Sequence, residues 1–251
     1  MPFYGKNLPE IGKYLLFTVN SPILTLSKKL FSVFLLLFKD IDKFIDMLQL
    51  KKLPFFISLV SIYLIITYIQ QEYVSIPQIS NLDVPDEIKE RFLKSFAQYR
   101  WVGFAIVPVF ILIRVAYAAL CLFLKELFAS DMEKTNYSSC FNVALKADII
   151  MLVAAVLTSV ISVCMGDTSV DCQRFYSLVC LADAETSERW LLVPLAAVNV
   201  FEIVYWFFMA KLFATENHCS YRYALGYVVS GYGVGYMFYI VLVIFLVLYL
   251  A

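Results

Sequence analysis

Residues 225–250 read LGYVVSGYGVGYMFYIVLVIFLVLYL and include no charged side chain. A helix of this length rises about 39 Å, which is more than the roughly 30 Å of hydrocarbon in a bilayer. A helix also satisfies its backbone polar groups internally, as a lipid environment requires. The stretch therefore predicts a membrane-spanning helix.

Four further stretches are apolar and long enough to cross: 53–70, 101–124, 147–165 and 190–213. Across the chain 62% of residues are hydrophobic and 16% are charged, with a mean hydropathy of +0.79, whereas soluble proteins are about 45–50% apolar and about 25% charged. The net charge is zero, so no basic field favours nucleic acid as a partner. The sequence predicts an all-α polytopic membrane protein with a five-helix transmembrane domain over 53–251.

Residues 1–52 form an arm before the first span. Phe31–Phe38 is apolar but too short to cross a bilayer. From Phe38 to Leu48, apolar residues recur at helical spacing, and Lys and Asp occupy the other face. This pattern is typical of a helix that lies in the membrane interface. Packing of the same face on the protein's own bundle is the alternative.

The distribution of Lys and Arg predicts the orientation, because positive residues are retained in the cytoplasm. With five spans, the side that carries the arm holds thirteen of them and the other side holds six. The N-terminus should therefore be cytoplasmic and the C-terminus outside. Cys172 and Cys180 then fall in an outer loop, where a disulfide would persist. A bridge and two unpaired thiols both fit, since connectivity cannot be deduced from sequence.

Two outer loops are long. The first, 71–100, predicts a short helix over Glu87–Ala97 that leads into the second span. The second, 166–189, is acidic. A solvated rim is the simpler interpretation of both loops, and a surface for partner proteins is the alternative.

Arg114 and Glu202 are charged residues inside predicted spans, where ionisable groups are costly and are usually paired or functional. Each lies at a similar distance along its span from the outer end, so we expect them to form a salt bridge between the second and fourth spans. Asn199 precedes Glu202 by one turn and extends the polar cluster. We favour a structural clamp; the alternative is a transport path or a site for an anionic lipid head group.

The last span contains small residues at helical spacing. Gly231 and Gly235 are four residues apart, which lets two helices approach closely, either within the bundle or at a dimer interface. Tyr232, Tyr236 and Tyr239 lie on a neighbouring face, where their hydroxyls need partners.

No catalytic constellation is present in the sequence. His218 is the single histidine, and it forms no metal-binding spacing with Cys219 and Cys140. Phosphate-binding loops and nucleophile elbows are absent as well. We therefore expect a non-enzymatic protein without cofactors or metals, whose partners are the lipid bilayer, other membrane proteins or further copies of itself.

Several features together resemble bacterial members of the Yip (Ypt-interacting protein) domain superfamily. They are five predicted spans with a cytoplasmic arm, the Asn20-Ser21-Pro22 turn, Pro108 early in the second span, the runs NYSSCFNVALKADII and NVFEIVYWFFMAKLF, and Tyr223-Ala224-Leu225. The resemblance covers about residues 14–250 and implies an integral membrane protein that acts through membrane shape, lipids or other membrane proteins. The motifs of the eukaryotic members are missing, so their Rab-binding role is not carried over.

These observations favour a subunit or scaffold of a membrane complex, or a protein of membrane organisation and trafficking, with an amphipathic helix on the cytoplasmic leaflet. The resemblance implies the bacterial inner membrane. The alternative is a small transporter or channel component that uses Arg114, Asn199 and Glu202.

Overall fold

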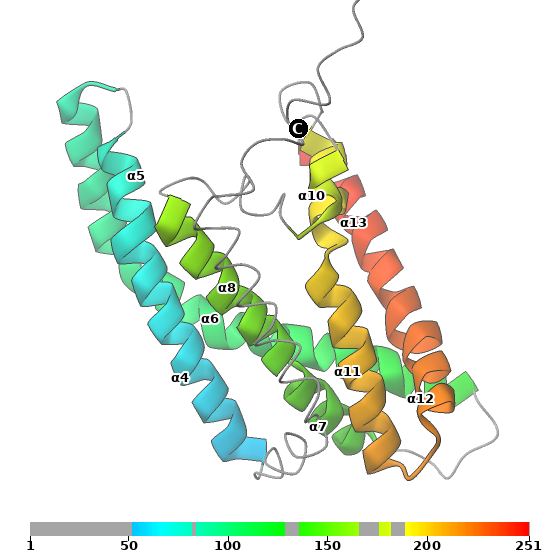
Figure 1. Ribbon diagram of the computed structural model, residues 1–251. Coiled ribbons are helices and arrows are strands. Elements are labelled where there is room, and N and C mark those ends of the chain that lie inside the picture. The colour runs from blue at the N-terminus through cyan, green and yellow to red at the C-terminus, as the bar shows by residue number, and fades with distance from the viewer. Residues whose placement is uncertain (1–51, 82–83, 129–135, 166–175, 182–188, 251) are drawn as a thin grey trace, which may run out of the picture. The chain divides into compact units, whose positions relative to one another are not determined.

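The computed structural model describes residues 52–81, 84–128, 136–165, 176–181 and 189–250, and these residues are helical apart from their connections (Figure 1). The elements in chain order are α4 (Lys52–Gln70), the π-helix η1 (Gln71–Ser75), α5 (Ile76–Ser80), α6 (Asp86–Phe128), α7 (Tyr137–Ala147), α8 (Ile149–Met165), the 3₁₀ turn η2 (Leu178–Leu181), α10 (Arg189–Ala197), α11 (Val200–Glu216), α12 (Tyr221–Val228), the π-helix η3 (Val229–Gly233) and α13 (Val234–Leu250).

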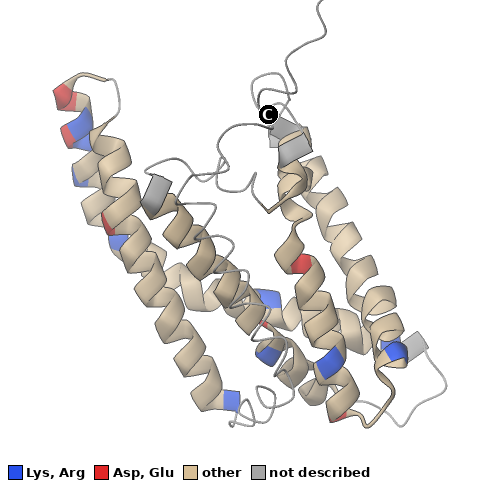
Figure 2. Ribbon diagram, viewed as in Figure 1, with Lys and Arg blue, Asp and Glu red and all other residues tan. Residues whose placement is uncertain are grey.

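Successive segments run in alternating directions, so their ends gather at two opposite ends of the bundle (Figure 1). At the lower end in the figure, Lys52 Nζ donates to the backbone oxygen of Ser138 at 2.8 Å, which ties the start of α4 to the start of α7. Basic residues of several helices lie toward this end, and those in the first part of α6 lie at the opposite end (Figure 2). At the upper end, Arg100 of α6 pairs with Glu72 of η1 at 2.8 Å.

Four helical segments of the described chain are long and apolar enough to cross a membrane: Lys52–Ser80, Asp86–Lys125, Tyr137–Val163 and Tyr221–Tyr249. They correspond to four of the five expected spans, and each begins earlier in the chain than expected, the first by one residue and the others by four to fifteen. The expected short helix over Glu87–Ala97 is the first part of α6 rather than a separate element. These segments indicate a membrane protein.

The expected fourth span, 190–213, is not one helix, which corrects the prediction of a continuous span. It is divided into α10 and α11 at Asn199, whose backbone is extended. Asn199 caps α11, because its side-chain oxygen accepts from the backbone N–H of Glu202 at 2.9 Å. The chain near Ser177 stabilises the interruption, since Val200 N–H donates to the carbonyl of Tyr176 at 2.9 Å.

The third span begins ten residues before its expected start. The expected boundary at Ala147 rested on the polar character of the preceding run, yet that run forms α7, which Asn136 caps. The backbone N–H of Asp148 donates to Ala144, so α7 and α8 continue one another with a small irregularity at Asp148. Asp148 is therefore in the middle of this span and not at its end.

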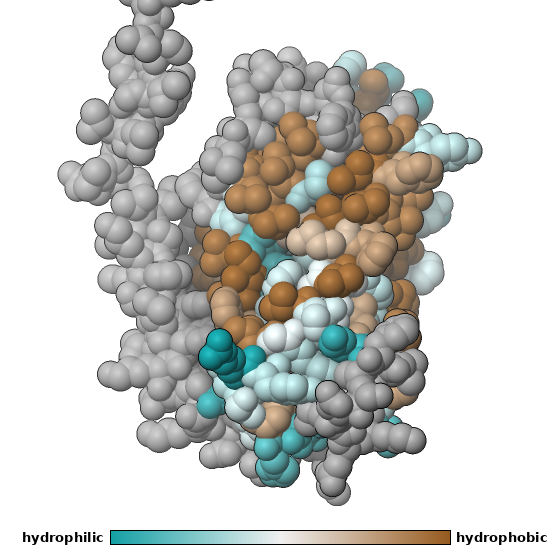
Figure 3. Space-filling view, turned by 90° about the vertical axis from the view of Figure 1, so that its right-hand side faces the viewer, coloured by the Kyte–Doolittle hydropathy of each residue, from teal (hydrophilic) through white to brown (hydrophobic). Residues whose placement is uncertain are grey.

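The most deeply buried side chains come from the lower half of α6, from α7, and from α11 and α12. They include Val115, Leu122, Val143, Leu145, Tyr205, Phe208, Met209, Phe213 and Val228. Large apolar side chains of α4, α6 and α13 point outward, as Phe238 and Phe245 do with about 70% exposure. Figure 3 shows one face with a broad apolar region above and hydrophilic residues gathered below. This distribution suits helices that face lipid.

Some predictions fall outside the described residues. They concern the amphipathic arm, most of the second outer loop, and the pairing of Cys172 with Cys180.

Candidate functional site

A buried ion pair joins the second and third membrane-crossing segments. Arg114 of α6 lies 2.5 Å from Asp148 between α7 and α8, measured from Nη2 to Oδ1. Asp148 has no exposed side-chain surface, and the Arg114 side chain is 29% exposed. Arg114 Nη2 also donates to the hydroxyl of Tyr63 in α4 at 3.0 Å. The pair therefore holds three segments of the bundle together.

The partner of Arg114 corrects the expected Arg114–Glu202 salt bridge. Asp148 takes that place because α7 extends the third span and carries this carboxyl to the depth of Arg114. Glu202 instead accepts two hydrogen bonds from neutral groups, both at its Oε1 atom and both at 2.9 Å. The donors are the indole N–H of Trp206 and the hydroxyl of Tyr232. Its side chain is buried.

Glu202 nevertheless belongs to the same polar network as the ion pair. It interacts electrostatically with both Arg114 and Asp148. Tyr205, one turn after Glu202 on α11, interacts with all three charged groups and is fully buried. Within the described part of the chain, neither the Tyr205 hydroxyl nor Asp148 Oδ2 has a hydrogen-bond partner. We refer to Tyr63, Arg114, Asp148, Glu202, Tyr205 and Tyr232 as the buried network.

Three members of the buried network, Tyr63, Arg114 and Asp148, lie at a similar depth in the bundle. Tyr63 follows Lys52 by eleven residues, and Arg114 precedes Lys125 by the same number. Asp148 follows the first residue of α7 by eleven residues as well, and eleven residues of helix rise about 16 Å. In a hydrocarbon layer about 30 Å thick, this depth is near the middle.

Both π-helices carry residues of polar clusters. In η3 they include Tyr232, the donor to Glu202, and in η1 they include Gln71 and Glu72, the partners of Arg100. A π-turn is rare and is frequently found at functional sites. The wider turn alters the direction in which the following side chains point, and here it accompanies polar contacts between segments.

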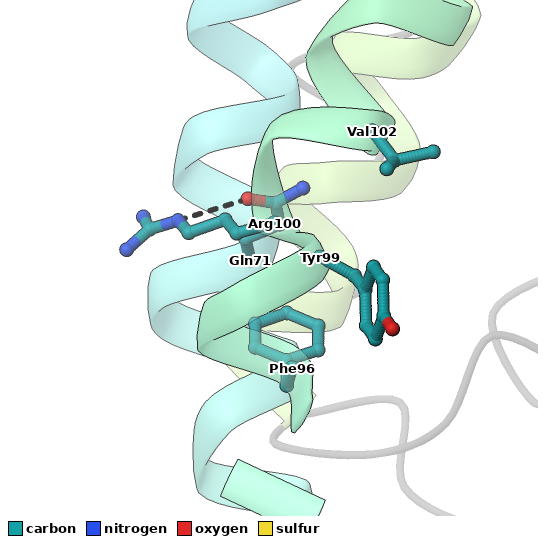
Figure 4. A pocket seen from close by; sticks show the side chains of 6 residues that line it. Gln71, Phe96, Tyr99, Arg100 and Val102 are labelled. Atoms are coloured by element: carbon teal, nitrogen blue, oxygen red, sulfur yellow. Dashed lines mark hydrogen bonds between the residues drawn. The ribbon is translucent and has the colours of Figure 1, made fainter. Parts of the chain in front are cut away.

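The Arg100 cluster borders a shallow pocket at the upper end of the bundle. The pocket is lined by Gln71, Phe96, Tyr99, Arg100, Val102 and Gly103. Figure 4 shows the Arg100 side chain crossing to Gln71, with Nε donating to Oε1 at 3.0 Å, and the rings of Phe96 and Tyr99 on the other side. Arg100 also stacks over the Tyr68 ring at 5.0 Å. This arginine is occupied by neighbouring groups of η1 and α4, so we assign the cluster a structural role.

The glycine face of the last span lies against α6 of the same chain. A Cβ atom on Gly231 would lie 3.2 Å from the backbone oxygen of Cys121, and one on Gly235 would collide with the Cys121 sulfur. Beside it, Tyr117 donates to the backbone oxygen of Gly235 at 2.6 Å. The neighbouring hydroxyls have partners too, since Tyr236 donates to the Ala197 oxygen at 2.8 Å. The small residues therefore permit close packing within the bundle.

At the lower end, His218 is exposed and adopts a positive φ of 49° in the turn between α11 and α12. Partial burial raises the pKa of the adjacent Cys219 thiol. Among the described residues, no group of three or more His, Cys, Asp or Glu side chains is arranged to hold a metal ion.

The chemistry available to the buried network is the binding and movement of charge. It has one permanent cation, Arg114, and two acids, Asp148 and Glu202. The sequence alone pointed to Arg114, Glu202 and Asn199, whereas the expected span 147–165 has Asp148 at its very start. The missed signal was the helical spacing of the apolar residues Cys140, Val143 and Ala147 before it, which extends the span upstream.

Comparison of the chain with protein-family models, with curated proteins and with solved structures found no match in any of the three.

Proposed function

We propose that this chain is a component of a small membrane transporter or channel, and that the buried network is part of its transport path. One observation carries the proposal: a second buried acid, Glu202, lies within electrostatic range of an ion pair that is already complete without it. Ionisable residues at the centre of a membrane are costly, and in transporters they mark ion and proton pathways.

The interrupted helix supports the same proposal. Transporters commonly place their ion and substrate sites at discontinuous helices near the midplane, because the ends of the half-helices present free backbone groups there. Glu202 lies in the first turn of α11, directly after the interruption at Asn199. We infer that α10 and α11 together form a fifth crossing, which returns the C-terminus to the side opposite the N-terminal arm.

The count of Lys and Arg in the sequence, thirteen on the side of the N-terminal arm against six on the other, supports a cytoplasmic placement of the lower end. The resemblance to bacterial Yip-like proteins supports the inner membrane. The orientation and the membrane are thus part of the proposal. The same resemblance implies a protein without catalytic activity.

A scaffold or complex subunit is the second candidate. The observation that favours it is the contact of Arg114 with both Asp148 and Tyr63, which fixes three segments as a structural clamp would. In this case the bundle is a rigid support, and membrane partners bind its outer surfaces.

Reconstitution into liposomes with a trapped pH-sensitive dye separates the two candidates. An imposed pH or cation gradient should collapse faster with the wild-type protein than with Glu202→Gln, while both variants insert and fold equally. Glu216→Gln is the matched control, because Glu216 is exposed at the end of α11. Equal rates for the wild type, for Glu202→Gln and for protein-free liposomes would refute transport and favour the scaffold.

A further inference from the structure

The buried network carries an excess of acidic groups. If Arg114, Asp148 and Glu202 were all ionised, the network would have a net charge of minus one near the centre of the membrane. An uncompensated charge in a medium of low dielectric is strongly unfavourable, and an acid in that position takes up a proton instead. One of the two carboxyl groups should therefore be neutral.

The contacts distinguish the two acids. Asp148 is in direct contact with the Arg114 guanidinium, which stabilises an ionised carboxylate. Glu202 receives both of its side-chain donors, Trp206 and Tyr232, at the single atom Oε1. A carbonyl oxygen accepts two hydrogen bonds, and in a neutral acid the other oxygen carries the proton. These two donors are neutral, and they stabilise a negative charge on Glu202 less than the guanidinium stabilises one on Asp148. Glu202 is therefore the less favourable of the two positions for a negative charge.

The groups that face Glu202 come from several elements. The charged groups are Arg114 on α6 and Asp148 between α7 and α8. The aromatic groups are Tyr205 and Trp206 on α11, Tyr232 on η3 and Tyr236 on α13. Among these neighbours, Arg114 is the one cation, and it is already paired.

We propose that Glu202 holds the single exchangeable proton of the buried network, while Asp148 stays ionised against Arg114. When the proton leaves, the O–H bond of the Glu202 carboxyl breaks, the electron pair stays on the carboxylate and the proton passes to water. The network then has a charge of minus one until a proton or another small cation neutralises it. The inference rests on the proposed transport function, and it identifies the transported ions as protons and small cations.

Infrared difference spectra test the assignment directly. The full-length protein in lipid nanodiscs should show the carbonyl stretch of a protonated carboxylic acid at neutral pH. Glu202→Gln should remove this band, and Glu216→Gln should leave it in place. A band that persists in Glu202→Gln, or its absence from the wild type, would overturn the assignment.

A second variant tests the charge balance. In Asp148→Asn the guanidinium of Arg114 loses its anion, so Glu202 should ionise and the band should disappear although Glu202 is still present. A band that remains in a folded Asp148→Asn protein would refute the charge balance proposed for Arg114, Asp148 and Glu202. If this variant does not fold, the comparison of Glu202→Gln with Glu216→Gln alone decides the assignment.

The liposome assay keeps the two proposals apart. A band that Glu202→Gln abolishes, without any gradient collapse by the wild type, upholds the proton on Glu202 and refutes transport. Gradient collapse that depends on Glu202, without the band, upholds transport and refutes the resting proton.

Discussion

The Arg114–Asp148 pair gives the sharpest test of how the bundle is held together. Asp148→Asn keeps the shape of the side chain but removes the anion in contact with Arg114. Arg114 then has the neutral Tyr63 hydroxyl as a contact, and Glu202, whose hydrogen bonds go to other groups, has to balance its charge. Removing one member of a buried ion pair costs about 3–5 kcal/mol. Because Arg114 keeps its hydrogen bond to the Tyr63 hydroxyl, we expect a value at the lower end of this range, about 3 kcal/mol.

The assay is a double-mutant cycle. The free energies of unfolding of Asp148→Asn, Arg114→Leu and the double variant are measured in mixed detergent micelles by the loss of helical circular dichroism. Groups in direct contact show coupling energies of about 0.5–3 kcal/mol, and we expect the upper half of this range. The double variant should therefore be much more stable than the sum of the two single losses predicts.

A second cycle with Arg114→Leu and Glu202→Gln is the matched control. Glu202 bonds to Trp206 and Tyr232 rather than to Arg114, so its coupling to Arg114 should be clearly smaller. Single-variant losses for Arg114 and Asp148 that add within about 0.5 kcal/mol, or a larger coupling in the control cycle, would refute the pairing.

Three further predictions use the same unfolding measurement. Gly235→Ala should lower the free energy of unfolding by about 1–3 kcal/mol, because the added Cβ overpacks against α6. Gly226→Ala, whose added Cβ has nothing within 4 Å, should be neutral or slightly stabilising. Equal effects of the two substitutions would contradict the close approach of the last span to α6. Asn199→Ala removes the cap of α11 and should lower the free energy of unfolding by about 1 kcal/mol. Asn199→Ser keeps a capping oxygen and should retain most of that stability. An equal loss in both variants would argue against capping. Arg100→Met should lose no more than about 1 kcal/mol, because its ion pair with η1 is partly exposed, and a much larger loss would show that this cluster is central to the fold.

Hydropathy predicts the apolar centre of a span well, because it measures the property that the bilayer selects. It located the apolar parts of α4, α6 and α13 from the sequence. It fails where a helix continues through a polar run, as α7 does before Asp148. In α7 the polar residues lie on one face, while Cys140, Val143 and Ala147 are buried on the other. The mean hydropathy of the run is therefore low, although the run forms a helix.

The interruption at Asn199 is invisible to hydropathy for a different reason. Residues on both sides of it are apolar, and a break depends on whether the chain supplies other partners for the freed backbone groups. Those partners come from the segment near Ser177 and from the Asn199 side chain. Asparagine is a favoured N-cap residue, but that signal marks a helix start only once the surrounding backbone is known.

The construction of the network also bears on the choice between a clamp and a transport path. A clamp between α6 and the third span needs Arg114 and Asp148 and nothing more, and a hydrophobic pair of similar volume serves stability as well or better. Glu202 adds a buried acid without a cation of its own, and it follows a helix interruption and bonds to a π-turn. Each of these features costs stability in a lipid environment and none improves the clamp. A buried acid at a helix interruption suits a site that exchanges charge. For this reason Glu202, rather than the ion pair, is the residue on which transport should depend.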